Sequence, residues 1–297
     1  MYAFAFVAHR AVSAMRIRRV TAVLVALGLV VVASAAGGAT LEEIKKRGYM
    51  VVVTEDDYPP FEFVKEGKPM GLDHDLYRLL KEYAKFEVRQ EIVPWQGLLA
   101  GVATGKYDVA ITAAIITDER AKSLSFTMGT AEGTHHYVKR KGDDRIKGIK
   151  DLSGLTVGVQ QGSALYAELP QLEEMLKKTG GRLGRVVQYA SYPEIYQDVA
   201  NGRLDYAINT VTTIASLIRE KPDVFEMGEA VTKRSYHGWA VKRGNKELVA
   251  YLNDFLTKTR KDGTMYKSQE KWLGKAFPDL PYVCKLPGDR PCPEDAK

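Results

Sequence analysis

Two segments of similar sequence constrain the fold of this chain more than any other feature. Residues 105–111 read Gly-Lys-Tyr-Asp-Val-Ala-Ile, and residues 202–208 read Gly-Arg-Leu-Asp-Tyr-Ala-Ile. In each segment a glycine turn and an aspartate lead into a short apolar run, which is typical of a strand buried on both faces of a parallel sheet. The repetition predicts two similar α/β lobes rather than an array of small repeats.

The first of these segments continues into a sequence that favours ligand binding. The apolar run from Val109 to Ile116 is too short for a typical helix and predicts a strand, and Thr117-Asp118-Glu119 supplies N-cap chemistry for a following helix. Arg120 would lie in the first turn of that helix, beyond the carboxyl end of a strand, where open α/β sheets bind ligands. A guanidinium there can bind a carboxylate through two parallel hydrogen bonds. The alternative is a surface arginine paired with Asp118 or Glu119.

Strands and helices alternate along most of the chain, as in a doubly wound α/β protein. Apolar, β-branched runs predict strands at residues 49–54, 86–93, 109–116, 156–159, 185–189 and 236–242. Apolar residues at helical spacing, with capping residues and closing glycines, predict helices at residues 40–47, from 71, before 105, from 163, and at 193–201, 246–261 and 266–272.

The N-terminal region carries the pattern of an export signal. Starting from Met15, the arginines of residues 16–19 precede an apolar stretch from Val20 to Val32 and then small residues. This order predicts a signal peptide over residues 1–39, cleaved between Ala35 and Ala39, and therefore a periplasmic protein. An uncleaved membrane anchor is the alternative, although the apolar stretch is short for one. The start codon is either Met1 or Met15.

Charge and cysteine content narrow the functional classes. The net charge is +6, and losing the four arginines of residues 1–39 would leave +2 (6 − 4), without basic runs, so we expect no nucleic-acid partner. Cys284 and Cys292 lie in a proline-rich tail, and in an exported protein they are expected to form one disulfide. No metal site and no cofactor is expected.

Taken together, these motifs resemble one family along nearly all of residues 41–274. The chain is similar to the bacterial extracellular solute-binding proteins of the polar amino-acid type (family 3). The resemblance is carried by Tyr58-Pro-Pro-Phe61, Gly71-Leu-Asp73-His-Asp75-Leu, Trp95-Gln-Gly-Leu98, Gly105-Lys-Tyr-Asp108, Thr117-Asp-Glu-Arg120-Ala, Val157-Gly-Val-Gln-Gln-Gly-Ser163, Gly202-Arg-Leu-Asp205, and Asp262-Gly263-Thr with Lys271-Trp272.

The resemblance implies a type II periplasmic binding fold with two lobes and two crossover hinge strands, each lobe a doubly wound sheet with helices on both faces. Lobe 1 would comprise residues 41–133 plus 236–297, and lobe 2 residues 134–235, with the hinge near residues 131–135 and 234–237. The implied function is the capture of a small polar amino acid or amino-acid-like carboxylate for an ABC importer. The expected partners are that ligand and the importer's membrane permease, and the protein is expected to act as a monomer.

The family's ligand contacts carry over onto matching positions. The resemblance implies that the aromatic ring of Tyr58 stacks on the ligand, that Trp95 walls the pocket, and that Arg120 grips the ligand's α-carboxylate. In members that bind cationic side chains, the position of Glu55 faces the ligand's distal group. The full set of expected ligand-binding residues is Glu55, Tyr58, Trp95, Ala113, Ile115, Arg120, Gly162, Ser163, Asn209 and Thr210.

Two positions depart from the family pattern. Ile115 stands where the family often has a small hydroxyl residue, and Thr210, beside Asn209, stands where an acid usually holds the ligand's α-ammonium. Asp205 matches an aspartate with a structural role. A carboxylate without a free amine, or a ligand whose cation meets Glu55, therefore fits as well as an ordinary amino acid.

Two alternative functions stay open at this stage. One is an enzyme on the same fold that resembles cyclohexadienyl dehydratases, with Glu55 or, less favoured, Glu194 as the general acid or base. The other is a binding protein that presents its ligand to a sensory receptor.

Overall fold

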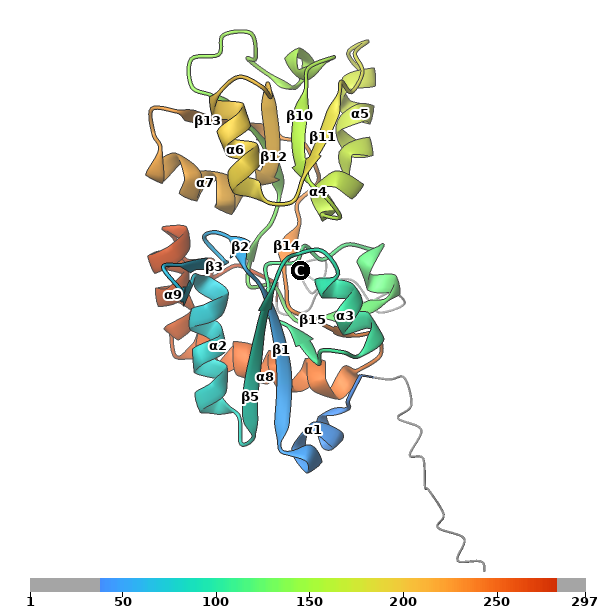
Figure 1. Ribbon diagram of the computed structural model, residues 1–297, viewed down its shortest axis with the longest axis vertical. Helices are drawn as coiled ribbons and strands as arrows, with labels where there is room; N and C mark the ends of the chain where they lie inside the picture. Colours follow the sequence, from blue (N-terminus) through green and yellow to red (C-terminus); the bar gives the residue numbers. More distant parts are fainter. Residues whose placement is uncertain (1–37, 282–297) are drawn as a thin grey trace, which may run out of the picture. The chain divides into compact units, whose positions relative to one another are not determined.

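The computed structural model describes residues 38–281 (Figure 1). The predicted signal peptide lies almost entirely outside the described residues, and so do Cys284 and Cys292 with their predicted disulfide. No helix within residues 38–281 is long and apolar enough to cross a membrane. The chain folds into α/β lobes built on two five-stranded mixed sheets.

The first lobe contains a sheet with the strand order β5-β1-β6-β15-β7. Strands β5, β1 and β6 are parallel, and β15 runs antiparallel between β6 and β7. A separate three-stranded sheet, β2-β3-β4, lies beside the end of β1. The elements of this lobe are α1 (Leu41–Arg47), β1 (Tyr49–Glu55), β2 (Asp57–Tyr58), β3 (Glu62–Lys65), β4 (Lys68–Met70), α2 (Leu72–Tyr83), β5 (Glu87–Val93), α3 (Leu98–Thr104), β6 (Val109–Ala110), the 3-10 helix η1 (Arg120–Lys122), β7 (Leu124–Phe126), β15 (Ala240–Lys242), α8 (Lys246–Lys261) and α9 (Thr264–Leu273).

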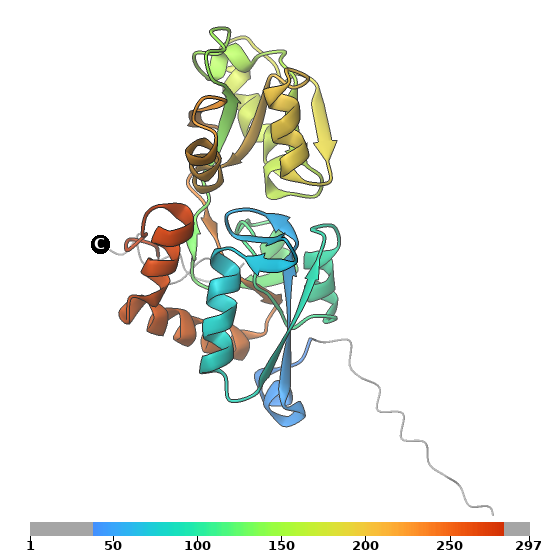
Figure 2. The ribbon, with the colours of Figure 1, turned by 60° about the vertical axis from the view of Figure 1, so that its left-hand side comes forward.

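The central strands of this sheet are covered on both faces, as the apolar strands predicted, whereas the edge strand β5 exposes part of its side chains. Successive residues of β1 pack into different clusters: Val52 joins the side chains of α1, α2 and α8, whereas Val53 joins Leu98 and Val102 of α3. Helices α2, α8 and α9 contact one another on one side of the sheet (Figures 1 and 2). Because the central strands are covered on both faces, their polar groups are available for function only at the strand ends.

The second lobe repeats the same topology. Its sheet has the order β11-β10-β12-β9-β13, with β11, β10 and β12 parallel and β9 antiparallel between β12 and β13. Its elements are β9 (His135–Arg140), the 3-10 helix η2 (Ile149–Leu152), β10 (Val157–Gln160), α4 (Ala164–Ala167), α5 (Leu169–Lys177), β11 (Val186–Tyr189), α6 (Tyr192–Ala200), β12 (Tyr206–Thr210), α7 (Val211–Glu220) and β13 (Phe225–Ala230). The first three strands of each sheet are therefore arranged alike, as the repeated segment predicted.

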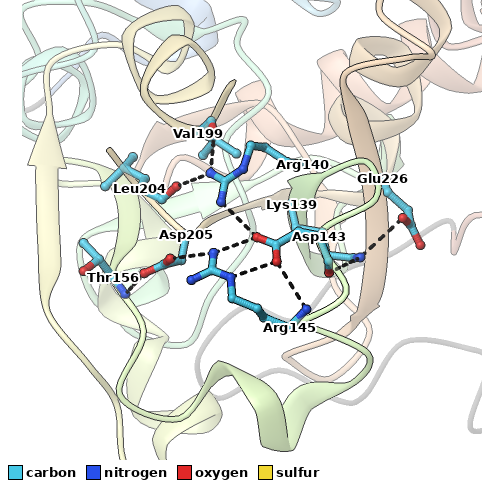
Figure 3. Close-up of polar contacts among 9 residues, drawn as sticks. All are labelled: Lys139, Arg140, Asp143, Arg145, Thr156, Val199, Leu204, Asp205 and Glu226. Carbon is cyan, nitrogen blue, oxygen red and sulfur yellow. Dashed lines mark hydrogen bonds and ion pairs between the residues drawn. The ribbon is translucent and has the colours of Figure 1, made fainter. Parts of the chain in front are cut away.

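The aspartates of the repeated segment do the same structural work in both lobes. Asp108 accepts a hydrogen bond from the backbone N–H of Val51 at 2.7 Å, and Asp205 accepts one from the N–H of Thr156 at 2.8 Å. An arginine pairs with each carboxylate: Arg47 with Asp108, and Arg145 with Asp205 at 3.0 Å. Figure 3 shows the second clamp, where Asp143 also links Arg145 to Arg140 of β9. These contacts give Asp205 the structural role that was expected.

The expected strand at residues 109–116 and the helix after it were wrong in detail. Strand β6 covers only Val109–Ala110, and the chain then leaves the ladder, with a tight turn in which Ala114 N–H donates to the carbonyl of Thr112 at 2.7 Å. The N-cap sequence begins only the three-residue 3-10 helix η1. The apolar residues of this segment are buried, as predicted, but instead of extending the sheet they form part of the wall of the site described below.

The expected strand at residues 236–242 is also divided. Tyr236–His237 forms β14, which pairs with β8 (Ala131–Glu132) in a separate two-stranded ladder, and only β15 joins the main sheet. The backbone N–H of Ile116 donates a hydrogen bond to the Tyr236 carbonyl at 3.0 Å, so the segment that follows β6 is bonded to this two-stranded ladder instead of to the main sheet. The two chain segments that join the lobes are thus held together as antiparallel neighbours.

Candidate ligand-binding site

Polar residues from both sheets meet at the carboxyl ends of their parallel strands. Glu55 is the last residue of β1, Gln160 is the last residue of β10, and Thr210 is the last residue of β12. Ala113 and Ile115 follow β6 in the chain. Ligands of open α/β sheets bind at this edge, and here two such edges face each other.

These strand ends border a narrow cavity between the lobes with a free volume of about 20 Å³. Seven of the ten expected residues line it, namely Glu55, Tyr58, Trp95, Ala113, Ile115, Arg120 and Ser163, and the other lining residues are Gln160, Ala164, Leu165 and Tyr192. Gly162, Asn209 and Thr210 were also expected at the site but do not line the cavity. That volume holds about one water molecule, so the lobes lie too close together in this state to admit a larger ligand. The walls of the cavity are aromatic and apolar side chains with a few charged groups.

Arg120 presents its guanidinium to this cavity. It is half-buried, it donates a hydrogen bond to the carbonyl of Ile115 at 2.9 Å, and it lies 5.1 Å from the centroid of the Trp95 ring. Glu119, its suggested surface partner, pairs with Lys122 instead. Within the described part of the chain, no carboxylate oxygen lies within 4.0 Å of the guanidinium. Burial lowers the pKa of Arg120 to about 10, which still leaves it cationic at neutral pH.

Glu55 is the acidic group of the cavity. Its side chain is 3% exposed, and Gln160 of the second lobe donates a hydrogen bond to it at 2.7 Å. Burial raises the pKa of Glu55 to about 8, against the lowering effect of the Gln160 donor, with Asp56 and Asp57 adding to the rise. Arg120, which borders the same cavity, lowers this pKa slightly, and with the lobes in contact the carboxyl is therefore mostly protonated at neutral pH.

The aromatic side chains of the site connect the two lobes. Tyr58 Oη donates to Asn209 Oδ1 at 2.8 Å, and the Tyr58 ring lies 5.6 Å from that of Tyr192. Tyr58 also stacks on Phe61 at 5.7 Å. A flat group entering the cavity would therefore meet aromatic faces from both lobes.

Ser163 serves mainly as a helix cap. Its Oγ accepts a hydrogen bond from Tyr166 N–H at 3.1 Å and donates to the Gln160 carbonyl at 2.7 Å, while the side chain borders the cavity. Both capacities of the hydroxyl are engaged by backbone groups, and its partners include no base. Acting as a nucleophile is therefore not supported by its surroundings.

Sequence comparison identifies the family to which this arrangement belongs. The profile of the bacterial extracellular solute-binding proteins, family 3, matches residues 50–275. The chain belongs to this family. The chain is similar to the L-cystine-binding protein TcyJ of Escherichia coli K12, with 31% identity over 245 residues that cover 82% of this chain and 89% of that protein. The ABC transporter arginine-binding protein 1 of the same strain is 29% identical over 221 residues, covering 73% and 87%.

Solved structures show the same two-lobed fold. An ancestral arginine-binding protein bound to arginine superposes with a TM-score of 0.67 at 31% identity, covering 76% of this chain and 98% of that one. The ancestral amino acid-binding protein AncCDT-1, a precursor of cyclohexadienyl dehydratase, superposes with a TM-score of 0.69 at 28% identity, covering 79% and 100%. The type II periplasmic binding fold expected for this solute-binding protein is confirmed.

In this solute-binding protein the polar side chains at the end of β12 form hydrogen bonds within the fold. Thr210 caps α7, its Oγ1 accepting from Thr213 N–H at 3.4 Å. Asn209 accepts from Tyr58 and from Thr210 N–H, and donates to Tyr196 Oη at 2.6 Å. These engagements explain why the two expected residues lie behind the cavity wall.

Four lining residues were not predicted from sequence, and two of them, Gln160 and Tyr192, carry polar groups. Gln160 lay inside the motif that preceded Ser163, and its position as the last residue of an apolar strand could have marked it, since strand ends form the site. Tyr192 begins α6, and only the fold brings it beside Tyr58. Residues 38–281 hold no group of three or more His, Cys, Asp or Glu side chains that could bind a metal ion.

Proposed function

We propose that this protein is the periplasmic substrate-binding component of an ABC importer and captures a small polar amino acid, or an amino-acid-like carboxylate, between its lobes. One observation carries the proposal most directly: the Arg120 guanidinium borders the cavity and forms no ion pair within the described residues. A half-buried guanidinium on which Glu168 acts only from beyond ion-pairing distance is stabilised further by an anionic ligand. Cystine- and arginine-binding relatives support an amino acid as that ligand.

In this proposal each wall of the cavity has its own role. Arg120 would bind the ligand's carboxylate, Tyr58 and Trp95 would pack on its body, and Glu55 would ionise to meet a cationic group. Ser163 and Gln160 would complete the site from the second lobe. Lobe 1 would comprise residues 41–133 with 236–297, lobe 2 residues 134–235, and the β8–β14 ladder the hinge. Because a ligand meets both contact sets only when the lobes are together, binding shifts the population to the closed form.

The test is titration calorimetry of the purified protein, refolded to remove carried-over ligand, with L-arginine, L-cystine and L-histidine. We expect at least one to bind, and Arg120→Ala to weaken it at least about 100-fold, because a desolvated charge pair is lost. Lys122→Ala is the matched control, since Lys122 is an exposed neighbour paired with Glu119. Equal affinity of Arg120→Ala and wild type would exclude the carboxylate clamp.

An enzymatic role has one observation in its favour, the raised pKa of Glu55 in the cavity, together with the similarity to a dehydratase precursor. Incubation of the wild-type protein with prephenate or arogenate, followed by chromatography, tests it. Product that disappears in Glu55→Gln would replace the transport proposal with catalysis.

A further inference from the structure

Two buried carboxyl groups lie behind the cavity wall, on β3 and α2. Glu62 and Asp73 are both 0% exposed. Glu62 Oε1 accepts hydrogen bonds from Thr112 Oγ1 and from Ala113 N–H, the latter at 3.1 Å, and Asp73 Oδ1 accepts from Trp239 Nε1 at 2.8 Å. The second oxygen of each group, Glu62 Oε2 and Asp73 Oδ2, has no donor among the described residues.

The two carboxyl side chains lie within hydrogen-bonding reach of each other, and the backbone brings their elements together. Asp73 N–H donates to the Phe61 carbonyl at 2.8 Å, so the start of α2 is tied to the residue before Glu62. A buried oxygen without a donor costs free energy, and two adjacent buried carboxylates repel. One proton between Oε2 and Oδ2 removes both costs, because the protonated group donates to the other.

The surroundings favour that proton. Burial and the neighbouring Asp73 raise the pKa of Glu62 well above its usual range, Glu55 of β1 adds to the rise, and burial raises the pKa of Asp73 to about 6. Burial also lowers the pKa values of His74 and His237 to about 4, so both imidazoles are neutral. Burial keeps Tyr58 of β2 un-ionised. The cations on the other packed elements are exposed or already paired: Lys68 of β4 is exposed, and Arg89 of β5 pairs with Glu87. Arg78 of α2 and Lys271 of α9 both pair with Asp75.

We propose that Glu62 and Asp73 share one proton and that this pair positions the segment 112–115, which forms the ligand-facing wall of the first lobe. Glu62 holds Thr112 and Ala113 directly. The Ala113 carbonyl accepts from His237 Nδ1 at 2.7 Å, and the Ile115 carbonyl accepts from Arg120. Glu62 is therefore a positioning residue for Arg120, a role that rests on the proposed ligand site, whereas the shared proton does not.

Infrared spectroscopy of the ligand-free protein tests the proton directly. In a Glu55→Gln background, which removes the other carboxyl of raised pKa in the site, we expect the band of a buried carboxylic acid at neutral pH. Glu55→Gln/Glu62→Gln should lose it, because the introduced amide would donate to an ionised Asp73. Glu55→Gln/Glu66→Gln, which changes an exposed residue of the same hairpin, should keep it. A missing band in Glu55→Gln, or a band that survives Glu62→Gln, would overturn the shared proton.

Binding of L-arginine and L-cystine tests the positioning role. Glu62→Gln should bind within about twofold of wild type at pH 7, because its amide keeps an acceptor for the Ala113 N–H and a donor to Asp73. Glu62→Ala should bind at least about tenfold more weakly than Glu62→Gln at pH 7, since the Ala113 N–H loses its acceptor. Equal affinities of Glu62→Ala and Glu62→Gln would refute positioning. Absence of binding by every variant, with the infrared result intact, would refute the proposed ligand class and leave the shared proton standing.

Discussion

The two copies of the repeated segment begin alike and end differently. Both start with a glycine turn and an aspartate. Asp108 accepts a backbone hydrogen bond from Val51 in β1, and Asp205 accepts one from Thr156, just before β10. After β12 the chain enters α7 at once, with Thr210 as its cap. After β6 the chain leaves the sheet and passes through an irregular buried segment before Arg120.

This difference explains why the two lobes offer different chemistry. A regular helix pairs most of its own backbone groups, and its first N–H groups donate hydrogen bonds to the side chains at the end of the preceding strand. Those side chains are then not available to a ligand. An irregular buried segment needs outside partners, which Glu62 and His237 provide in the first lobe. The charged groups of the cavity, Arg120 and Glu55, therefore come from the first lobe, and the second lobe contributes neutral groups such as Gln160 and Tyr192.

The largest expected effect concerns the aspartate of the repeated segment, Asp108 in the first lobe and Asp205 in the second. Asp108→Ala should lower the free energy of unfolding by about 3 kcal/mol and Asp205→Ala by about 1 kcal/mol, because the Asp108 side chain is 4% exposed and that of Asp205 is 21% exposed. Urea unfolding followed by circular dichroism measures both. Equal losses would mean that burial does not distinguish the two copies.

A second prediction concerns lobe closure and pH. The pKa of Glu55 is raised to about 8 with the lobes in contact, and its ordinary value is 4.5. If separation of the lobes restores the ordinary value, the closed form binds more protons between these values, so closure is favoured as pH falls from 8 towards 4.5 and is lost as pH rises. We expect the closed-to-open ratio to change roughly tenfold or more over this window.

Small-angle X-ray scattering of the ligand-free protein at pH 5 and pH 8 measures this change. Glu55→Gln is the control, because it keeps an acceptor for Gln160 and cannot ionise. A radius of gyration that changes equally with pH in the variant would assign the effect to another group.

The smallest expected effect compares the two threonines that follow the repeated strands. Thr210→Ala should cost about 1 kcal/mol, because α7 loses its cap. Thr117→Ala should cost no more than about 0.5 kcal/mol, because Thr117 caps only a short 3-10 helix and is partly exposed. Thermal unfolding at fixed pH suffices, and a larger loss at Thr117 would reverse the assignment of roles.

Much of the fold and part of the site could be predicted from sequence. Helix α1 begins at its capping box with Thr40 and ends at Gly48, as expected, and Ser163 caps α4. Tyr58 and Arg120 lie in the cavity because strand ends and turns placed them there. Tyr192 could not be assigned, since nothing local reports that the start of α6 lies beside Tyr58, whereas Gln160 stands at a strand end that could have marked it.

Local sequence decided the elements and their order, because caps, glycine turns and apolar periodicity act over a few neighbouring residues. Tertiary structure alone decided where β6 stops and which acids lose their charge. Segment 112–115 lies outside the sheet, and the backbone N–H and carbonyl of Ala113 form hydrogen bonds with the side chains of Glu62 and His237, which are distant in sequence. The protonation of Glu55 and of the Glu62–Asp73 pair follows from burial, a property that exists only after distant elements have packed.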